Sequence, residues 1–251
     1  MPPDISYRPI QAHECEKVAD LHKRTFPPDA VKRTIYASTR ISRYLQNLVS
    51  YPDLQGDHFL LGAWHDRNLV GYAHFRALPA SWHLNYIAVL PAYQGRGVGH
   101  ELWKRFVEAG KQRGCGRLSL DVEHDNLRAL DWYRRRHMAV VATTRTYETF
   151  LEPSGESPAG AVKLLDWEAA EAWQASYGFS RFQLLCRGKT WSIGRIGDSY
   201  FRASEALQPV LESALAAIDA GRCLLVATPE ELKEQRFREV EVALRMEGEV
   251  I

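Results

Sequence analysis

The segment Val89–His100 reads VLPAYQGRGVGH and joins an apolar run to a long amphipathic stretch. Its alternating glycines, Gly95, Gly97 and Gly99, allow the backbone to turn tightly and to approach a bulky ligand closely. The first amides of a following helix have no partner inside that helix, and the helix dipole favours negative charge there. The segment therefore predicts a pyrophosphate cradle, with a ligand-free glycine-rich connection as the alternative. A dinucleotide fingerprint is excluded, because GxGxxG starting at Gly95 requires glycine where the chain has His100.

A second patterned segment follows the next predicted strand. Asn126, Ala129 and Tyr133 are spaced i, i+3 and i+7, so they share one face of a helix predicted over Asn126–Arg136. The small Ala129 leaves a groove with an amide at one end and a phenol at the other. A buried tyrosine that merely satisfies its own hydroxyl is the alternative interpretation.

The elements predicted around these two motifs run in the order β-α-α-β-β-β-α-β-α-β. This order is typical of an α/β fold with a mixed sheet and helices on both faces. The strands are predicted at Ile5–Ile10, His58–His65, Leu69–Leu78, Trp82–Leu90, Arg117–Glu123 and Met138–Leu151. The helices are predicted at Ala12–Phe26, within Ala30–Leu48, and at Val98–Arg113 and Asn126–Arg136.

Together, the two motifs resemble those of the GNAT superfamily of acyl-CoA-dependent N-acetyltransferases. Gln94–Gly99 matches the family's Q/R-x-x-G-x-G/A motif, and Asn126, Ala129 and Tyr133 match its N-x-x-A-x-x-x-Y pattern. The predicted element order is also that of the family, and the resemblance covers about residues 5–150. One departure is visible, because the family usually has Gly-Phe where this chain has His137-Met138, which predicts a different helix end.

The resemblance implies a binding site for acetyl-CoA as co-substrate. Backbone amides at the glycine turn would hold the pyrophosphate, the backbone of one strand would pair with the pantetheine, and Asn126 would touch the pantetheine arm beside Ala129. Tyr133 would protonate the departing thiolate. The turn residues are Gln94, Gly95, Arg96, Gly97, Val98, Gly99 and His100, and the strand residues are Ile87, Ala88 and Val89.

The general base is left open between three side chains and a water relay. Asp121 and Glu123 alternate with Leu120 and Val122, so both carboxylates point to one face of a strand. An acidic residue at position 121 is similar to the base position of some GNAT peptide acetyltransferases. His83 is the third candidate, because an imidazole titrates near the working pH.

The composition excludes several classes of protein. Lys and Arg number 32 and Asp and Glu 31, so a polyanion binder acting by bulk charge is not expected, and neither is a nucleic-acid partner. No apolar run approaches the ~20 residues of a membrane span, and the first residues show no signal peptide. Cys15, Cys115, Cys186 and Cys223 form no CxxC pair, so neither a disulfide framework nor a structural zinc is expected. The prediction is a cytoplasmic protein without a membrane partner or a metal.

A composition shift at residues 152–160 predicts a linker, because nine residues there carry no large apolar side chain. It would separate an acetyltransferase-like domain over residues 1–151 from a smaller α/β domain over residues 161–251. With 21 basic and 15 acidic residues, residues 1–150 carry a net charge of +6, and the remainder carries −5. The second domain shows no phosphate-binding turn and no catalytic signature. We interpret it as a degenerate GNAT-like half that covers the acceptor site or forms an oligomer interface, for example in a homodimer.

In the second domain, strands are predicted at Ala161–Leu165, Phe182–Cys186, Trp191–Arg195, Ser199–Arg202, Cys223–Ala227 and Glu239–Met246. Helices are predicted at Trp167–Tyr177, Glu205–Ala220 and Glu230–Arg236.

The predicted function is direct acetyl transfer from acetyl-CoA to an amine of a small molecule or peptide in a ternary complex. The alternatives are O-acyl transfer to a hydroxyl of a sugar or similar molecule, and a non-catalytic acyl-CoA sensor. An anionic acceptor would be attracted by the basic residues of the first helices, if they faced the pocket. Those residues are Lys23, Arg24, Lys32, Arg33, Arg40 and Arg43; a solvated face, or contacts to the acidic second half, is the alternative.

Overall fold

The computed structural model describes residues 4–51, 58–152 and 158–250, which form two compact units. Unit 1 comprises Met1–Val31, Ile41–Ala142 and Leu244–Ile251, and unit 2 comprises Lys32–Arg40 and Thr143–Ala243. Each unit thus contains segments from both the first and the last part of the chain, an exchange of segments that the single boundary predicted at residue 151 does not describe. The predicted linker falls partly outside the described residues, which omit 153–157.

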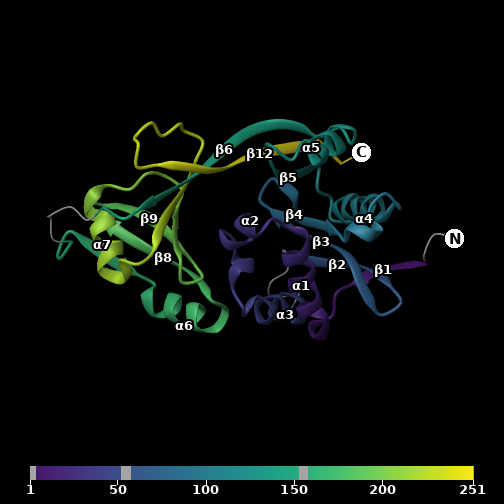
Figure 1. Cartoon of the computed structure of the whole chain (residues 1–251), viewed down its shortest axis with the longest axis horizontal. Coiled ribbons are helices and arrows are strands. Elements are labelled where there is room, and N and C mark those ends of the chain that lie inside the picture. The colour runs from purple at the N-terminus through teal and green to yellow at the C-terminus, as the bar shows by residue number, and fades with distance from the viewer. Residues whose placement is uncertain (1–3, 52–57, 153–157, 251) are drawn as a thin grey trace. The chain divides into compact units, whose positions relative to one another are not determined.

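The elements of unit 1 can be followed in Figure 1 from β1 to α5. Its strands are β1 Ile5–Pro9, β2 His58–His65, β3 Asn68–Leu78, β4 Ser81–Val89 and β5 Arg117–Glu123. Its principal helices are α1 Cys15–Thr25, α3 Ile41–Ser50, α4 Val98–Gln112 and α5 Leu127–Arg134. Shorter helical segments are η1 Ala12–Glu14, α2 Pro28–Lys32, η2 Ile35–Ala37 and η3 Pro91–Tyr93, of which η2 belongs to unit 2.

The sheet of unit 1 has the order β1-β2-β3-β4-β5, with the C-terminal part of β12 (Arg238–Glu249) beside β5. Neighbouring strands from β1 to β4 are antiparallel, whereas β4 and β5 are parallel. Phe75 packs on Phe106 of α4, while Tyr72 is hydrogen-bonded to His22 of α1. Because residues three apart on a strand point to opposite faces, α1 and α4 cover opposite faces of this sheet. The predicted mixed α/β fold is confirmed.

The strands β4 and β5 separate partway along their length. They pair through Trp82–Leu118, His83–Ser119 and Leu84–Leu120, and no further pair joins them within the described residues. The register of β4 against β3 shifts at the same level, between His74 and Phe75, which leaves Asn85 as the extra residue of a bulge. The bulge and the lost pairing together open a gap between the two parallel strands from residues 85 and 121 onward.

Unit 2 has the strand order β6-β11-β10-β9-β8-β7. Its strands are β6 Ala139–Phe150, β7 Val162–Leu165, β8 Phe179–Cys186, β9 Lys189–Ile196, β10 Tyr200–Ala203 and β11 Cys223–Thr228, and its helices are α6 Trp167–Tyr177 and α7 Pro209–Asp219. β10 and β11 are parallel and are connected through α7, as β4 and β5 are connected through α4. The start of β6 belongs to unit 1, as does the end of β12.

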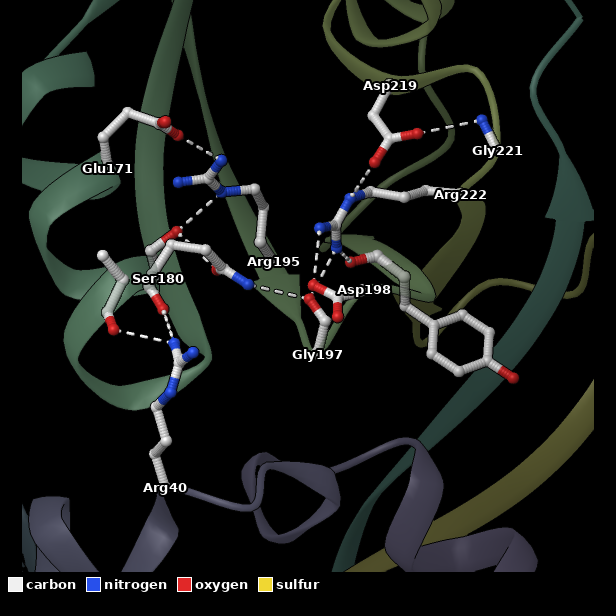
Figure 2. A network of polar contacts seen from close by, with 12 residues as sticks. Arg40, Glu171, Ser180, Arg195, Gly197, Asp198, Asp219, Gly221 and Arg222 are labelled. Carbon is white, nitrogen blue, oxygen red and sulfur yellow. Dashed lines mark hydrogen bonds and ion pairs between the residues drawn. The ribbon is translucent and has the colours of Figure 1, made fainter.

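A polar network ties α6 to the strands of unit 2 (Figure 2). The buried Arg195 donates to Glu171 at 2.5 Å and to Ser180 at 2.8 Å. Arg222 donates to Asp219 and to the carbonyl oxygen of Gly197. Each of these two buried guanidinium groups is thereby paired with a carboxylate, as burial of a charge requires.

Residues 32–40 cap the C-terminal end of α6 within unit 2. The Arg40 Nη1 atom donates to the carbonyl oxygen of Ala175 at 2.7 Å, and Figure 2 shows its guanidinium beneath that helix. Ser38 Oγ donates to the carbonyl oxygen of Tyr177 at 2.5 Å. The last carbonyls of a helix have no partner within it, and a positive charge there is favourable, so this segment stabilises α6.

Two element predictions in the second domain were wrong. Glu230–Arg236 is irregular rather than helical: Leu232 donates its N–H to the Tyr147 hydroxyl, and Arg236 pairs with Glu212. The helix predicted from Glu205 begins at Pro209, whose fixed φ and missing N–H suit the first helical position. Among the described residues, no helix is both long enough and apolar enough to cross a membrane.

Candidate acetyl-CoA and acceptor site

The glycine turn leads into α4 with two residues in the left-handed region. Gly95 has φ 73° and Gly97, the N-cap residue of α4, has φ 84°. A Cβ atom added at either position would meet no other atom within 4 Å, so the turn is open on that side. Gly99 is the one turn glycine with neighbours, Val89 and Trp132, near the place of an added Cβ. The turn therefore offers open backbone at a helix N-terminus, which is the geometry that a pyrophosphate requires.

Gln94 holds this turn in place through its side chain. Its Nε2 atom donates to the carbonyl oxygen of Val89 at 3.0 Å, and its Oε1 atom accepts from Arg128 Nη1 at 3.0 Å. Gln94 thus fastens the end of β4 to α5 across the start of the turn. The structure gives it a positioning role, and its contact with coenzyme A stays a prediction.

Several positive side chains surround the N-terminus of α4. Arg136 stacks on Trp132 at 3.5 Å and lies 3.2 Å from the His100 ring, and Arg96 lies over Tyr93. Together with Arg128, they place three guanidinium groups around the turn. Their charge adds to the helix dipole in favouring an anionic ligand.

The predicted pantetheine strand lies along the gap between β4 and β5. Ile87, Ala88 and Val89 pair with β3 on one side and lie beyond the last pair with β5 on the other. Backbone groups on an unpaired strand edge are available to an added strand-like ligand. The gap and the open glycine turn lie at the same end of β4, as a long ligand with a pyrophosphate head requires.

The α5 motif residues have distinct roles at the start and end of the helix. Asn126 is the N-cap, and its Oδ1 atom accepts from the Ala129 N–H at 3.1 Å. Its Nδ2 atom has no hydrogen-bond partner among the described residues and remains a donor. Tyr133 is buried against Trp103 and Trp132, and burial raises the pKa of its phenol. The phenol therefore keeps its proton at neutral pH, as a general acid must.

The helix end at His137 adopts the left-handed conformation with φ 61°, although the residue is not glycine. The N–H of His137 bonds to the carbonyl of Arg134, and that of Met138 bonds to Tyr133. The different helix end predicted from the His-Met pair is therefore not observed. The backbone makes the usual turn and accepts the strain.

His83 lies on β4 just before the gap and faces away from Leu84 and the core. Its Nδ1 atom lies 3.0 Å from Ser119 Oγ, and its Nε2 atom lies 3.9 Å from Asp121 Oδ2. Burial lowers the pKa of His83 to about 4, against the opposing effect of the Asp121 charge. The ring is thus neutral at physiological pH and can accept a proton, though as a weak base.

Asp121 is the first residue of β5 beyond the last pair with β4. Both of its carboxylate oxygens are bound by Arg245 of β12, Oδ1 at 2.5 Å from Nε and Oδ2 at 2.8 Å from Nη2. Glu123 lies two residues further on, on the same face. The bidentate pair holds Asp121 beside His83 and lowers its availability as a free base; the choice of base stays open.

The basic residues of the first helices are partly accounted for by contacts within unit 2. Arg33 donates to the carbonyl of Val240 and lies 4.0 Å from Glu241, and Arg40 closes α6. Contact with the second half of the chain was one of the alternatives predicted for the basic residues of the first helices, and Arg33 and Arg40 make such contacts. They contribute no free charge to an acceptor.

In unit 2, the connection between β10 and α7 differs from the glycine turn. Residues 204–208 contain no glycine, Pro209 occupies the first helical position, and the first turn of α7 carries the buried Glu212. Glu212 accepts from Arg236 and from the N–H of Glu152. A carboxylate held there repels a pyrophosphate, so this helix N-terminus does not fit coenzyme A.

No group of three or more His, Cys, Asp or Glu side chains in the described part of the chain could hold a metal ion. The sequence prediction missed Arg128, Arg136 and Arg245. Arg128 lies on α5 and Arg136 lies in the turn just after it, and both fall within the helix predicted over Asn126–Arg136, so helical spacing could have indicated them. Arg245 is 124 residues from Asp121, and no local pattern indicates that pair.

The comparisons with known proteins agree with this geometry. The model of the acetyltransferase (GNAT) family matches residues 16–138. The chain is 34% identical over 71 residues to thialysine N-epsilon-acetyltransferase of Bos taurus, which covers 26% of this chain and 42% of that protein. It is 37% identical over 95 residues to N-alpha-acetyltransferase RimI of Mycobacterium tuberculosis, which covers 36% of this chain and 58% of that protein. The chain thus spans about half the length of these curated relatives.

Among solved structures, a tandem GNAT protein from the clavulanic acid biosynthesis pathway matches with a TM-score of 0.68 and 11% identity. The match covers 98% of this chain and 99% of that protein, so the likeness in fold extends through the second half. Residues 16–138 therefore form a domain of the acetyltransferase (GNAT) family, in a chain whose fold over its whole length resembles that of tandem GNAT proteins.

Proposed function

We propose that the protein transfers the acetyl group of acetyl-CoA to an amine of a small molecule or peptide, directly and within a ternary complex. The observation that carries this proposal is the gap between β4 and β5 beside the open turn of Gly95 and Gly97. The two relatives described above are named as acetyltransferases that act on nitrogen, which favours an amine over a hydroxyl.

Acetyl-CoA, when bound, supplies the activated thioester. The amides of the glycine turn would hold its pyrophosphate, and the edge of β4 at Ile87–Val89 would align the pantetheine with the Asn126 amide as a further donor. Holding both substrates in one site supplies much of the rate gain by proximity. The protein's own chemistry then reduces to donating one proton and accepting another.

Tyr133 would donate the proton to the leaving sulfur, because its buried phenol stays protonated. For the other proton, His83 is neutral and borders the gap, and Asp121 holds a fixed position beside it. Glu123 and a water relay stay alternatives. A backbone amide near Ala88 or Val89 would stabilise the oxyanion.

The test is release of free thiol from acetyl-CoA with panels of amino acids, peptides, polyamines, amino sugars and sugar nucleotides. Tyr133→Phe should lower turnover by about 10²-fold or more with little change in coenzyme affinity, while Tyr7→Phe, in β1, should leave turnover unchanged. Unchanged turnover in Tyr133→Phe removes this residue from the mechanism. Release with sugar hydroxyls alone would indicate O-acyl transfer. A melting temperature raised by acetyl-CoA without any release would favour the sensor.

A further inference from the structure

Arg76 is a partly buried cation of the unit 1 sheet, and the described residues supply no counter-ion for it. It lies on β3, on the face of Tyr72 and His74, and its direct cross-strand neighbour on β4 is His83. The Arg76 Nε atom is buried and has no hydrogen-bond partner. Within the described part of the chain, no carboxylate lies within ion-pair distance of its guanidinium group.

The groups that face Arg76 do not neutralise it. His83 is neutral, and burial holds the pKa of His74 well below its usual range, so that ring is neutral too. His58 is the cross-strand neighbour of Arg76 on β2 and is hydrogen-bonded to His74 at 2.9 Å. The carboxylate of Asp121, which borders His83, has both oxygens occupied by Arg245. Asp121 is thus paired with Arg245 and does not serve as a counter-ion for Arg76.

A buried Nε–H without a hydrogen-bond partner costs free energy, and the planar guanidinium of Arg76 suits a carboxylate. Neighbouring strands in a sheet are about 4.8 Å apart. The backbone of Arg76 on β3 therefore lies roughly one strand spacing from His83 on β4, and roughly two from β5 on the far side of the gap. An anion bound by Arg76 would therefore lie within ~10 Å of the reacting amine. This upper limit admits acceptors in which only a few bonds separate the amine from the carboxylate.

Resting on the proposed transferase function, we propose that Arg76 binds a carboxylate of the acceptor and selects amines that carry a carboxylate a few bonds from the nitrogen. Arg76 is then a specificity-determining residue, and the acceptors that it selects are α-amino acids or similarly short amino acids. The basic helices of the first half are not needed for this selection.

The experiment compares acetyl transfer to a panel of α-amino acids and to the corresponding amino-acid amides. The wild-type protein should prefer the acids. Arg76→Gln should lower kcat/KM for the acids by about 10- to 100-fold, mainly through KM, and leave the amides nearly unchanged. Arg76→Lys should give an intermediate loss. Arg67→Gln removes the same charge just before the other end of β3 and should have no effect. Equal loss for acids and amides, or a wild-type preference for amides, would overturn the proposal.

Binding separates this proposal from the proposed function. With coenzyme A at saturation, calorimetry should show that N-acetyl amino acids bind the wild type more tightly than their amides, and that Arg76→Gln removes the difference. Equal affinities in the wild type would refute the carboxylate site even if acetyl transfer occurs. A retained difference without transfer to any acceptor would support the site and count against the enzyme.

Discussion

Replacing Gly97 by Ala tests the glycine turn as a coenzyme site, because the structure supplies a matched control. Gly97 has φ 84° and Gly188, in the hairpin between β8 and β9, has φ 79°. An added Cβ at either position meets no atom within 4 Å. The two substitutions therefore impose the same backbone strain without a clash, and they differ in that one stands at the helix N-terminus proposed to hold the pyrophosphate.

Alanine in the left-handed region destabilises the folded state by about 1–2 kcal/mol. The lower entropy of the unfolded chain offsets about 0.4–1 kcal/mol of this, so the free energy of unfolding of each variant should fall by up to about 1.5 kcal/mol. That corresponds to a fall in Tm of a few °C. At Gly97 the methyl group would also keep the phosphate from the neighbouring amides. Loss of one hydrogen bond to a charged group, worth about 1.5–3 kcal/mol, weakens coenzyme A by about 10- to 150-fold.

Thermal melts and calorimetric titration with coenzyme A measure both quantities. We expect Gly97→Ala and Gly188→Ala to lose similar stability and only Gly97→Ala to lose coenzyme affinity. Gly97→Glu, which adds a negative charge, should abolish binding. If Gly97→Ala binds coenzyme A within about twofold of wild type, the turn is not the pyrophosphate site, whatever its effect on stability.

Burial lowers the pKa of His22 to about 3 and of His83 to about 4, and that of His74 lies well below its usual range. The unfolded chain therefore binds more protons below about pH 6.5, and the free energy of unfolding should fall between about pH 6.5 and 4, by about 1.4 kcal/mol per pH unit for each such histidine. Denaturant titrations at several pH values measure this dependence. The free energy of unfolding should fall less steeply with decreasing pH in His22→Gln than in the wild type, and an equally steep fall contradicts this account. His137→Gly should raise Tm by about 2–4 °C through relief of a φ of 61°, while a lower Tm would show that the His137 side chain contributes more than the strain costs. Calorimetry should give one coenzyme A per chain because Glu212 stands at the helix start in unit 2, whereas two per chain would contradict that reading.

Local patterns predicted the fold and the glycine turn between β4 and α4 well. Gly95 and Gly97 indicate the strand-to-helix junction, because glycine adopts their positive φ values without strain. Alternation along β5 correctly placed Asp121 and Glu123 on one face, since period-two burial is a local property. These features depend on a few consecutive residues.

Features that depend on distant partners could not be predicted. The pairing of Asp121 with Arg245 requires β12 to lie beside β5, which no local pattern encodes. The predicted helix at Glu230–Arg236 has helical composition, yet a hydrogen bond to Tyr147 and the packing of Leu232 decide its backbone. The bulge at Asn85, which opens the strand gap, also has no glycine or proline to indicate it.

The exchange of segments between the two units has a consequence for how the chain acquires its structure during synthesis. Unit 1 receives its edge beside β5 from Leu244–Ile251, which the ribosome adds after every residue of unit 2. Unit 2, in turn, needs Ser38 and Arg40, made more than 130 residues before the α6 carbonyls that they bind. Unit 1 therefore cannot complete its contacts until all of unit 2 has been made, and unit 2 depends on a segment that lies between two segments of unit 1 in the sequence. We expect the two to fold as one cooperative event, and expression of residues 1–151 alone to leave Asp121 without Arg245 and β5 without its neighbour.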